Sequence, residues 1–548
     1  RHLGIHNGGM VITGVPLSQR VPTEPATMEN RFVTQWDKEA LEDIGLVKID
    51  ILGLRMLSAV ADAVEMVSHL TGERLDLHTL TFDDPLVYDL ICAADTVGVF
   101  QVESRAQAQV LPRLLPRCFN DLIVSISLIR PGPVQGDMVH PYLRRRLGQE
   151  AVVYFHPLLE PALRETLGVI LFQEQVIKVA RDLAGFSAGQ GELLRRALGA
   201  RHPGEAVERF RQAFLNGAAA RGVDTATAEQ VFDKLRAFGG YSFPKSHAAA
   251  FAVLVYRSAW LKYYHPAAFY TGLLNNQPMG FWSPAVIVND VRRHGISVLR
   301  VDVNHSQSRC GVEADSIRLG FNYVRDFSME AGERVVLARG STPFIHLEDF
   351  CKRTRLPRRL VENLIAAGAM DSWGGERRDL LWALGMLPET LTGLDLVIPS
   401  ETVILPALSQ HEQAGMEMAM TGLTTGDHPM QIYRQILQRR GILSSSDLNP
   451  CPAGKQVRVS GLLVVHQAPP TAKGYRFLTL EDEFGFINVI VRPKVYAQFR
   501  RVVREQPLLL VVGEVQHEGS VTNVVAVQLH SLSHFLTGLE GQRSIFRA

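Results

Sequence analysis

The chain has 548 residues, of which 46% are hydrophobic and 21% charged, and its 57 Lys and Arg balance 56 Asp and Glu. This composition is ordinary for a soluble folded protein and provides for about three to five domains. The balanced charge excludes a globally basic nucleic-acid-binding protein, so any site for a polyanion must be a local patch.

The cysteines argue against a zinc-binding or disulfide-rich protein, and the hydropathy argues against a membrane protein. The five cysteines lie far apart and form no CxxC pair, so the sequence predicts neither a zinc site nor a disulfide framework. Scattered single cysteines suit a reducing cytoplasm. The sequence shows no signal peptide and no run of about 18 apolar residues, so we predict a cytoplasmic protein with no membrane partner.

The first charged motif lies in the segment EDIGLVKIDILGL. A β-branched run between two glycines favours a strand over a helix. Val47, Ile49 and Ile51 then share one face, which we expect in a core. Lys48 and Asp50 share the opposite face. The carboxylate is either functional or part of a solvated sheet edge, and these residues alone leave both interpretations open.

The apolar pattern changes several times along the chain. Residues 56–300 are mainly helical, with apolar residues at helical spacing and helices that end at Gly or before Pro. Residues 301–385 open with short strands and continue as short helices, and residues 386–450 form a connector with one or two helices. From Val457 short strands alternate with turns over about 80 residues, which indicates a small closed or half-closed barrel.

The helix expected in FPKSHAAAFAVLVYRSAW begins with polar residues and is otherwise apolar almost all round. Ser246 is a natural N-cap, and Lys245 and His247 flank it. Free N–H groups, the helix dipole and a cation together favour a bound phosphate at this end. The alternative is a plain capped helix of the core.

Two further segments present arginines among apolar residues. In LLRRALG, Arg195 and Arg196 diverge by about 100° on a helix, so they either grip one polyanion from two angles or form a solvated face. Arg130 precedes a stiff Pro-Gly-Pro turn, which either presents its guanidinium to a phosphate or ends an element. In FQVESRAQ we expect an internal ion pair between Glu103 and Arg105.

The expected barrel carries Lys473, Tyr475, Arg476 and Phe477 within TAKGYRFLTLEDEFG. Single-stranded nucleic acid needs a ring to stack on and charge for its backbone, and these residues supply both. The alternative is that the aromatic residues simply pack the barrel.

Taken in order, these motifs resemble the C family of bacterial DNA polymerases, the replicative α-subunit group. The phrases VTQWDK, FQVESRAQ and NNQPMGF, with the β-rich tail, are similar to the error-prone, damage-tolerant branch. The resemblance covers nearly the whole chain and rests on these segments: FVTQWDKEALEDIGLVKIDILGL, DTVGVFQVESRAQ, LIRPGPVQGDMVHPYLRRR, LFQEQVIKVARDLAGFS, LLRRALG, YSFPKSHAAAFAVLVYRSAWLK and HPAAFYTGLLNNQPMGF.

The resemblance implies a multidomain α+β fold that forms the carboxy-terminal half of a polymerase of roughly twice this length. The expected parts are the end of a nucleotidyltransferase-type palm (1–55), helical fingers (56–300), a helix-hairpin-helix-like domain (301–385), a helical connector (386–450), an OB-fold β-barrel (451–535) and a tail (536–548).

The resemblance also implies phosphoryl transfer from a dNTP to a primer 3′-hydroxyl, with two Mg²⁺ held by three acidic residues. Asp50 matches the third of these carboxylates, and Lys48 is expected near the nucleotide or the DNA backbone. The implied partners are primed template DNA and dNTPs, together with a sliding clamp or accessory damage-tolerance proteins. Phosphate contacts are expected from Arg130, Arg195, Arg196, Lys245, Ser246 and His247.

The sequence departs from the family in three respects. It contains no P-D-x-D-x-D-F strand, which supplies the other two carboxylates, so we expect that this chain alone does not extend a primer. Residues 324–328, VRDFS, replace a glycine-containing hairpin loop, which argues against duplex binding there. Residues 386–450 show no convincing clamp-binding peptide.

Two other interpretations remain open. One is a fragment of the replicative DNA polymerase III α subunit itself, against which the missing clamp peptide argues. The other is a non-catalytic DNA-binding remnant that kept the fingers and the barrel. An in-frame P-D-x-D-x-D-F encoded upstream of Arg1 would exclude this remnant.

Overall fold

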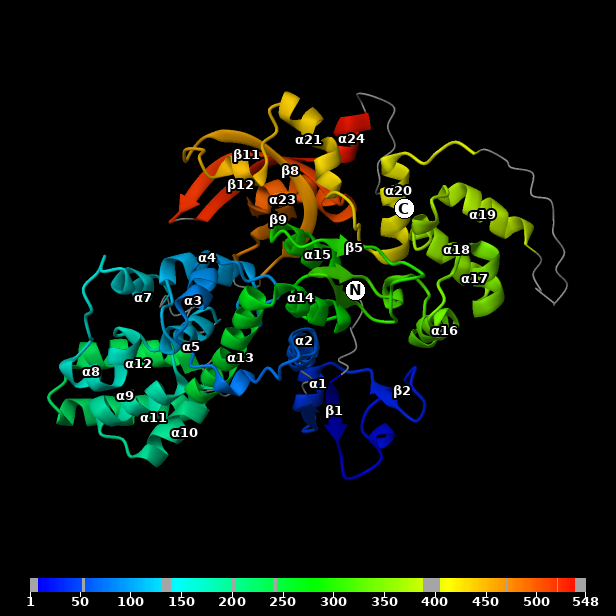
Figure 1. Ribbon diagram of the computed structural model, residues 1–548. Coiled ribbons are helices and arrows are strands. Elements are labelled where there is room, and N and C mark those ends of the chain that lie inside the picture. The colour runs from blue at the N-terminus through cyan, green and yellow to red at the C-terminus, as the bar shows by residue number, and fades with distance from the viewer. Residues whose placement is uncertain are drawn as a thin grey trace. The chain divides into compact units, whose positions relative to one another are not determined.

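The structure is a computed structural model, shown in Figure 1. It divides into two compact units, residues 1–58 and residues 59–548. None of the described helices is long and apolar enough to cross a membrane. The described residues are 8–51, 55–130, 139–199, 204–239, 244–387, 405–469, 472–519 and 521–537.

The first unit contains two antiparallel strand pairs and one short helix. β1 (Gly9–Ile12) pairs with β4 (Val47–Asp50), and Gly9 lies opposite Asp50 in the register. The predicted strand around Asp50 is therefore present. The remaining elements are a 3-10 helix (Leu17–Gln19), β2 (Thr23–Pro25), β3 (Phe32–Thr34) and α1 (Lys38–Asp43).

The apolar face of β4 is exposed, so the prediction that it lies in a core is wrong. Val47, Ile49 and Ile51 are 59%, 44% and 59% exposed. Residues opposite each other in a register share a face, and Val11, opposite Lys48, packs against the small core of this unit. Only the opposite face of this sheet packs on the small core, and on that face Lys48 is partly buried whereas Asp50 is exposed.

The second unit begins with a long helical region, as predicted. Its helices include α2 (Arg55–Thr71), α3 (Pro85–Cys92), α4 (Arg105–Leu114), α5 (Phe119–Leu128), α7 (Val139–Arg146), α8 (Glu160–Leu163), α9 (Gln173–Ala184), α10 (Ala188–Leu198), α11 (Gly204–Ala220), α12 (Thr225–Gly239), α13 (Lys245–Tyr264), α14 (Pro266–Asn275) and α15 (Pro284–Arg293).

The helix α13 lies at the centre of this region and packs against α3, α5 and α14. Its alanines and valines are small, so neighbouring helices can approach closely. Ala248, Ala252, Val255 and Ala259 are completely buried. The prediction of an apolar, buried helix is confirmed for this face of α13.

A short mixed segment and further helices follow. β5 (Val298–Leu299) is parallel to β7 (Ser316–Arg318), which is antiparallel to β6 (Gly311–Glu313). The helices after this sheet are α16 (Met329–Arg339), α17 (Leu347–Thr354), α18 (Arg358–Ala366), α19 (Arg377–Met386), α20 (Gln410–Thr421), α21 (Pro429–Arg439) and α22 (Ser445–Leu448).

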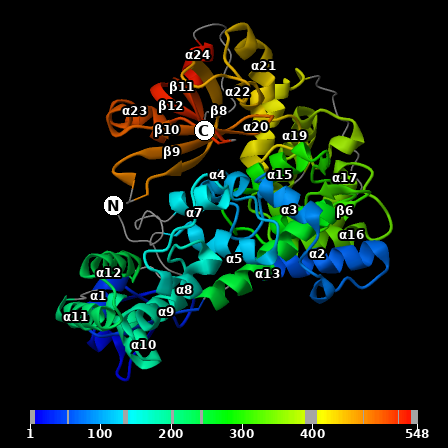
Figure 2. The same ribbon diagram turned by 90° about the vertical axis from the view of Figure 1, so that its left-hand side faces the viewer.

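The chain ends in a closed five-stranded barrel, as predicted. The strand order is β10-β12-β11-β8-β9, and the β9–β10 pair closes the barrel. A helix, α23 (Pro493–Glu505), connects β10 and β11, the third and fourth barrel strands along the chain. It packs on β12 (Figure 2). The strands are β8 (Gln456–Gln467), β9 (Arg476–Glu481), β10 (Phe486–Val491), β11 (Leu508–Glu518) and β12 (Val521–Ser531), followed by α24 (Leu532–Thr537).

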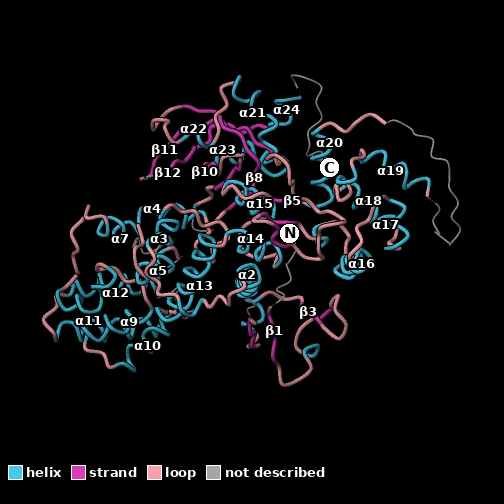
Figure 3. Tube along the Cα trace, in the orientation of Figure 1, coloured by secondary structure: helices cyan, strands magenta, loops and turns pink. Residues whose placement is uncertain are grey.

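Figure 3 shows the two kinds of structure, with helices dominant from α2 to α22 and strands dominant from β8 onward. Alternation of apolar residues along β8 to β12 fills the barrel with a core of its own. The predicted multidomain α+β fold with a carboxy-terminal barrel is confirmed.

Candidate active-site and nucleic-acid-binding residues

Asp50, the expected magnesium ligand, lies at the end of β4 and is exposed to solvent. Its carboxylate forms an ion pair with the ammonium of Lys48, on the same face of the strand. Among the described residues, no group of three or more metal-ligating side chains includes Asp50. One carboxylate already paired with a cation does not fit two Mg²⁺, because each ion needs several oxygen ligands.

The start of α13 differs from the sequence prediction. The helix begins at Lys245, and the extended residue Pro244 takes the N-cap position. Ser246 therefore lies in the first turn, and the prediction that it caps the helix is wrong. Proline favours this entry because its φ is fixed and it has no N–H group to satisfy. Ser246 and His247 are exposed.

Carboxylates of the protein itself occupy the anion site predicted at this helix end. The backbone N–H of Lys245 donates to both oxygens of Glu174, at 3.2 and 3.0 Å. The Lys245 ammonium forms an ion pair with Glu165. A backbone N–H group and a cation lie together here, but a phosphate would have to displace these two carboxylates.

The adjacent arginines of α10 converge on one anion, and that anion is Glu192. Arg195 donates to both of its oxygens at 2.7 Å, and Arg196 Nε donates at 2.9 Å. The hydrogen bonds from Arg195 and Arg196 lower the pKa of Glu192 to about 2. Both arginines therefore hold a carboxylate of their own helix, and their contact with a polyanion stays a prediction.

Arg130 directly follows α5 and is partly buried. Its Nε donates to the carbonyl of Ile126 at 3.4 Å, and burial lowers its pKa. The Pro-Gly-Pro turn at residues 131–133 lies outside the described residues. The structure thus places Arg130 at the end of a helix, next to a segment that it does not describe.

Glu103 and Arg105 make separate contacts, so the expected ion pair between them is wrong. Glu103 accepts hydrogen bonds from the backbone N–H groups of Phe281 (2.9 Å) and Gly98 (3.2 Å). Burial raises the pKa of Glu103 to about 7. The Arg105 guanidinium points instead at the barrel, where it donates to the carbonyl of Leu478 at 3.0 Å.

The four predicted residues of the barrel divide into two groups. Lys473 and Tyr475 are exposed, and the Arg476 guanidinium lies 4.7 Å from the centre of another ring, that of Tyr496. The Phe477 ring is covered, because the Arg105 guanidinium lies 5.2 Å from its centre. Phe477 therefore packs against α4 and does not offer an open stacking surface.

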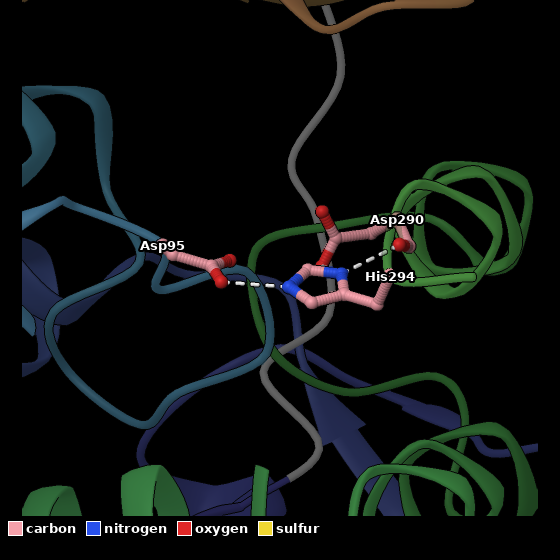
Figure 4. A group of neighbouring side chains, drawn as sticks. All are labelled: Asp95, Asp290 and His294. Atoms are coloured by element: carbon pink, nitrogen blue, oxygen red, sulfur yellow. Dashed lines mark hydrogen bonds and ion pairs between the residues drawn. The ribbon is translucent and has the colours of Figure 1, made fainter. Parts of the chain in front are cut away.

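A cluster of charged residues, which the sequence analysis missed, joins α13, α14, α15 and the residues after α3. Figure 4 shows three of its members, Asp95, Asp290 and His294, of which Asp290 is buried. The Lys262 ammonium lies 2.7 Å from an oxygen of Asp95 and 3.1 Å from an oxygen of Asp290. His294 Nε2 lies 2.6 Å from the other oxygen of Asp95. The Tyr270 hydroxyl donates to Asp290 at 2.5 Å.

The electrostatics of this cluster are those of an internal ion network. Burial opposes the charge on Asp95, but the His294 hydrogen bond and Lys262 together outweigh it and lower its pKa. The hydrogen bond to Asp95 raises the pKa of His294.

Asp95, Asp290 and His294 lie close enough together to hold a metal ion. The Lys262 ammonium already contacts both carboxylates, so the protein supplies the cation itself. Lys262, near the end of the largely apolar helix α13, was the available sequence signal for this cluster.

The loop at residues 324–328 precedes α16, and contacts within the protein hold its backbone. The Arg325 N–H donates to the carbonyl of Met420, in α20, at 2.8 Å. Asp326 has a left-handed φ of 61°, and its carboxylate pairs with Arg359. In the structure this N–H group is therefore not open to a DNA phosphate.

Three family descriptions match successive parts of the chain. Residues 1–53 match the bacterial DNA polymerase III alpha NTPase domain. Residues 56–222 match the bacterial DNA polymerase III alpha subunit finger domain. Residues 295–380 match a helix-hairpin-helix motif.

Curated relatives match over almost the whole chain, and each is named an error-prone DNA polymerase. The protein of Corynebacterium glutamicum is 44% identical over 97% of this chain and 50% of its own length. For Mycolicibacterium paratuberculosis the values are 45%, 96% and 49%. For Pseudomonas aeruginosa they are 42%, 98% and 53%. The chain thus spans about half the length of these relatives.

Proposed function

We propose that this chain, which belongs to the C family of bacterial DNA polymerases, is part of an error-prone DNA-directed DNA polymerase. The observation that carries the proposal is the 42–45% identity with error-prone DNA polymerases over nearly all of the chain. The proposed reaction is template-directed transfer of a nucleotide from a dNTP to a primer 3′-hydroxyl during damage-tolerant synthesis in the cytoplasm.

Each part of the chain has a proposed place in that polymerase. Asp50 would supply one of three carboxylates for two Mg²⁺, and the other two would come from a preceding part of the polymerase. A sliding clamp or accessory damage-tolerance proteins would act as partners. The proposed domains are the end of the palm (1–55), the fingers (56–300), a helix-hairpin-helix-like domain (301–385), a connector (386–450), an OB-fold (451–535) and a tail (536–548).

The fingers residues are proposed to contact the triphosphate or the template. Their present ion pairs support a site suited to anions, because arginine and lysine already hold carboxylates there. A phosphate would replace Glu192 at α10, or Glu165 and Glu174 at α13. The proposed contacts are Arg130, Arg195, Arg196, Lys245, Ser246 and His247.

Primer extension tests the proposed role of Asp50. We expect the 548-residue chain alone to extend no primer, because one carboxylate cannot organise two Mg²⁺. A longer chain that includes the preceding segment should extend it. Asp50→Asn in that longer chain should lower the rate by at least about 1,000-fold, since one metal ligand is lost.

The matched control in the longer chain is Asp43→Asn, a change at the end of α1 outside the proposed site. It should leave the rate within about twofold. The contrary result is primer extension by the 548-residue chain itself, with this activity lost on Asp50→Asn. That result would contradict the proposal that a preceding segment supplies the other two carboxylates.

A further inference from the structure

The outer face of β9 and β10 is covered by α4. The Arg105 guanidinium donates to the carbonyls of Leu478, in β9, and Val489, in β10, at 3.0 and 3.3 Å. The same guanidinium covers the Phe477 ring, and Arg105 is only 6% exposed. OB-folds commonly present the face of their second and third strands, here β9 and β10, to oligonucleotides.

The contact continues along one side of α4 at intervals of four residues, which share a helix face. Gln109 donates to Asn523, in β12, at 3.2 Å. Arg113 donates to Glu518, at the end of β11, at 2.8 Å. The other common oligonucleotide-binding parts of an OB-fold are the loop between its first and second strands and the loop between its fourth and fifth strands. The second of these lies between β11 and β12, and α4 reaches it at Glu518.

Residues from Trp282 into α15 close the rest of this face. The Trp282 and Phe486 rings are stacked, with centres 4.8 Å apart. Arg293 and Asn289 donate to the two oxygens of Glu481, at 2.9 and 3.0 Å, and the Glu481 side chain is fully buried. These hydrogen bonds and the stacked rings hold Trp282 and α15 against β9 and β10 within the same chain, so this face is covered.

A basic surface lies elsewhere on the barrel. In a chain with nearly equal numbers of acidic and basic residues, residues 464–476 and 492–504 contain no Asp or Glu. The first segment spans the end of β8 and the loop to β9, and the second spans nearly all of α23. Their basic residues are Lys473, Arg476, Arg492, Lys494, Arg500, Arg501 and Arg504.

Aromatic rings lie among these charges. The Tyr496 ring, in α23, lies between Arg476, at 4.7 Å, and the ring of His466, at 5.7 Å between centres. Arg500 and Arg504 follow Tyr496 along α23, beyond a kink at Phe499, and are exposed. Burial and the charges of Arg476 and Arg504 lower the pKa of His466, as expected where positive charge is not neutralised.

We propose that single-stranded nucleic acid binds this α23 flank of the barrel and not the face of β9 and β10. The proposal rests on the proposed polymerase function and identifies which barrel surface would meet the unpaired template. The arginines and the lysine would contact phosphates, and the exposed ring of Tyr475 would stack on a base. The flank consists of Lys473, Tyr475, Arg476, Tyr496, Arg500 and Arg504.

Salt-dependent binding of a fluorescent oligo-dT to the 548-residue chain tests the flank. Arg500→Ala with Arg504→Ala should weaken binding about tenfold and reduce the slope of log K against log salt by about 1.4, or about 0.7 for each lost phosphate contact. The matched control is Arg181→Ala with Arg236→Ala, two exposed arginines outside any proposed site, which should change neither value. Both double variants should keep the thermal midpoint of the parent chain.

A cross-link tests the covered face directly. Gln109→Cys and Asn523→Cys, joined by a short bis-maleimide in a Cys118→Ser background, would lock α4 on the barrel. Binding of oligo-dT should stay within about twofold of the chain that is not cross-linked. Loss of binding on cross-linking would overturn the proposal, because the nucleic acid would then need the face of β9 and β10.

The remaining outcomes separate this proposal from the proposed function. If the parent chain binds oligo-dT but the Arg500 and Arg504 variant binds equally well, the flank assignment fails and the polymerase assignment stands. If the parent chain binds no oligo-dT at low salt, the flank assignment fails, and the polymerase assignment is tested separately by primer extension with the longer chain. Weaker oligo-dT binding after Tyr475→Ala, with an unchanged salt slope, would support stacking on the flank.

Discussion

The Lys262 ammonium is one of the fully buried charges among the described ion pairs. Its side chain has no exposed area, and two carboxylates and the carbonyl of Val97 compensate for the lost hydration. Burying an isolated ammonium would cost far more than folding can supply. The stability of this region therefore depends on every member of the cluster being present.

Lys262→Met should lower the free energy of unfolding by about 2–3 kcal/mol, because Asp290 and Asp95 would each lose a cation. Asp290 would keep its ion pair with Arg293, and the partly exposed Asp95 would keep the one with His294. Urea denaturation followed by circular dichroism measures this change. Lys352→Met is the matched control, since Lys352 is exposed on α17, and it should change the free energy by less than about 0.5 kcal/mol. Equal effects of the two substitutions would contradict the network.

His294 should make stability depend on pH. Its folded-state pKa lies above the ordinary value of about 6.5, so folding favours the protonated ring. The stabilisation is complete below the ordinary pKa and is lost as pH rises through the folded-state pKa. His294→Gln should abolish this part of the pH dependence. Denaturation at pH 6 and pH 9 checks it, and identical pH profiles for the two proteins would contradict it.

The cations of the candidate sites could be predicted from sequence, whereas the partners of Lys245 could not. Lys245 lies 80 positions from Glu165 and 71 positions from Glu174. Spacing along a helix shows which side chains share a face, but only tertiary packing brings such distant groups together. For this reason the sequence predicted a phosphate at the start of α13, whereas the structure places the carboxylates of Glu165 and Glu174 there.

At the scale of elements, α10 and α13 begin in different ways. Ser187 is a true N-cap of α10, and its hydroxyl accepts the Gln190 N–H at 3.3 Å. Ser246 lies inside α13, whose first N–H group is satisfied by Glu174. Serine therefore stabilises the start of α10 by capping it, whereas the serine at the start of α13 caps nothing.

Ser187→Ala should lower the free energy of unfolding by about 1 kcal/mol, the usual cost of losing a cap. Ser246→Ala should change it by less than about 0.5 kcal/mol, because no cap is lost. Chemical denaturation of both variants provides the comparison. A larger loss for Ser246→Ala than for Ser187→Ala would show that Ser246 caps its helix after all.

The sequence predicted the positions of helices and strands better than it predicted which of their faces are buried. Apolar periodicity predicted the helices from α2 to α15 and the strands of the barrel. It failed at β4, where the apolar residues are exposed and Lys48 faces the small core. Periodicity shows which residues share a face, but the cover over that face comes from other elements.

At the scale of the whole molecule, the two units have very unequal cores. The first unit buries Val21, Leu41 and Leu46 in its cluster, whereas the helical part of the second unit has a core that runs from α3 to α13. Few buried apolar contacts mean a low free energy of local opening. Each unit should therefore open on its own timescale.

Hydrogen exchange measures this difference. Backbone amides of β4 should exchange at least about tenfold faster than those of β11, because β11 is paired on both sides within the closed barrel. Mass spectrometry of peptides from the two strands provides the rates. Equal protection of β4 and β11 would mean that the first unit is more stable than its core suggests.

The stripe of Arg105, Gln109 and Arg113 on α4 has a consequence for engineering chimaeras. Because α4 holds β9, β10, β11 and β12 by specific hydrogen bonds, a barrel transplanted from a relative will seat properly only if the donor's α4 is transplanted with it. The segment that contains α4 and the segment that contains the barrel lie some 400 positions apart, and a chimaera must exchange both together.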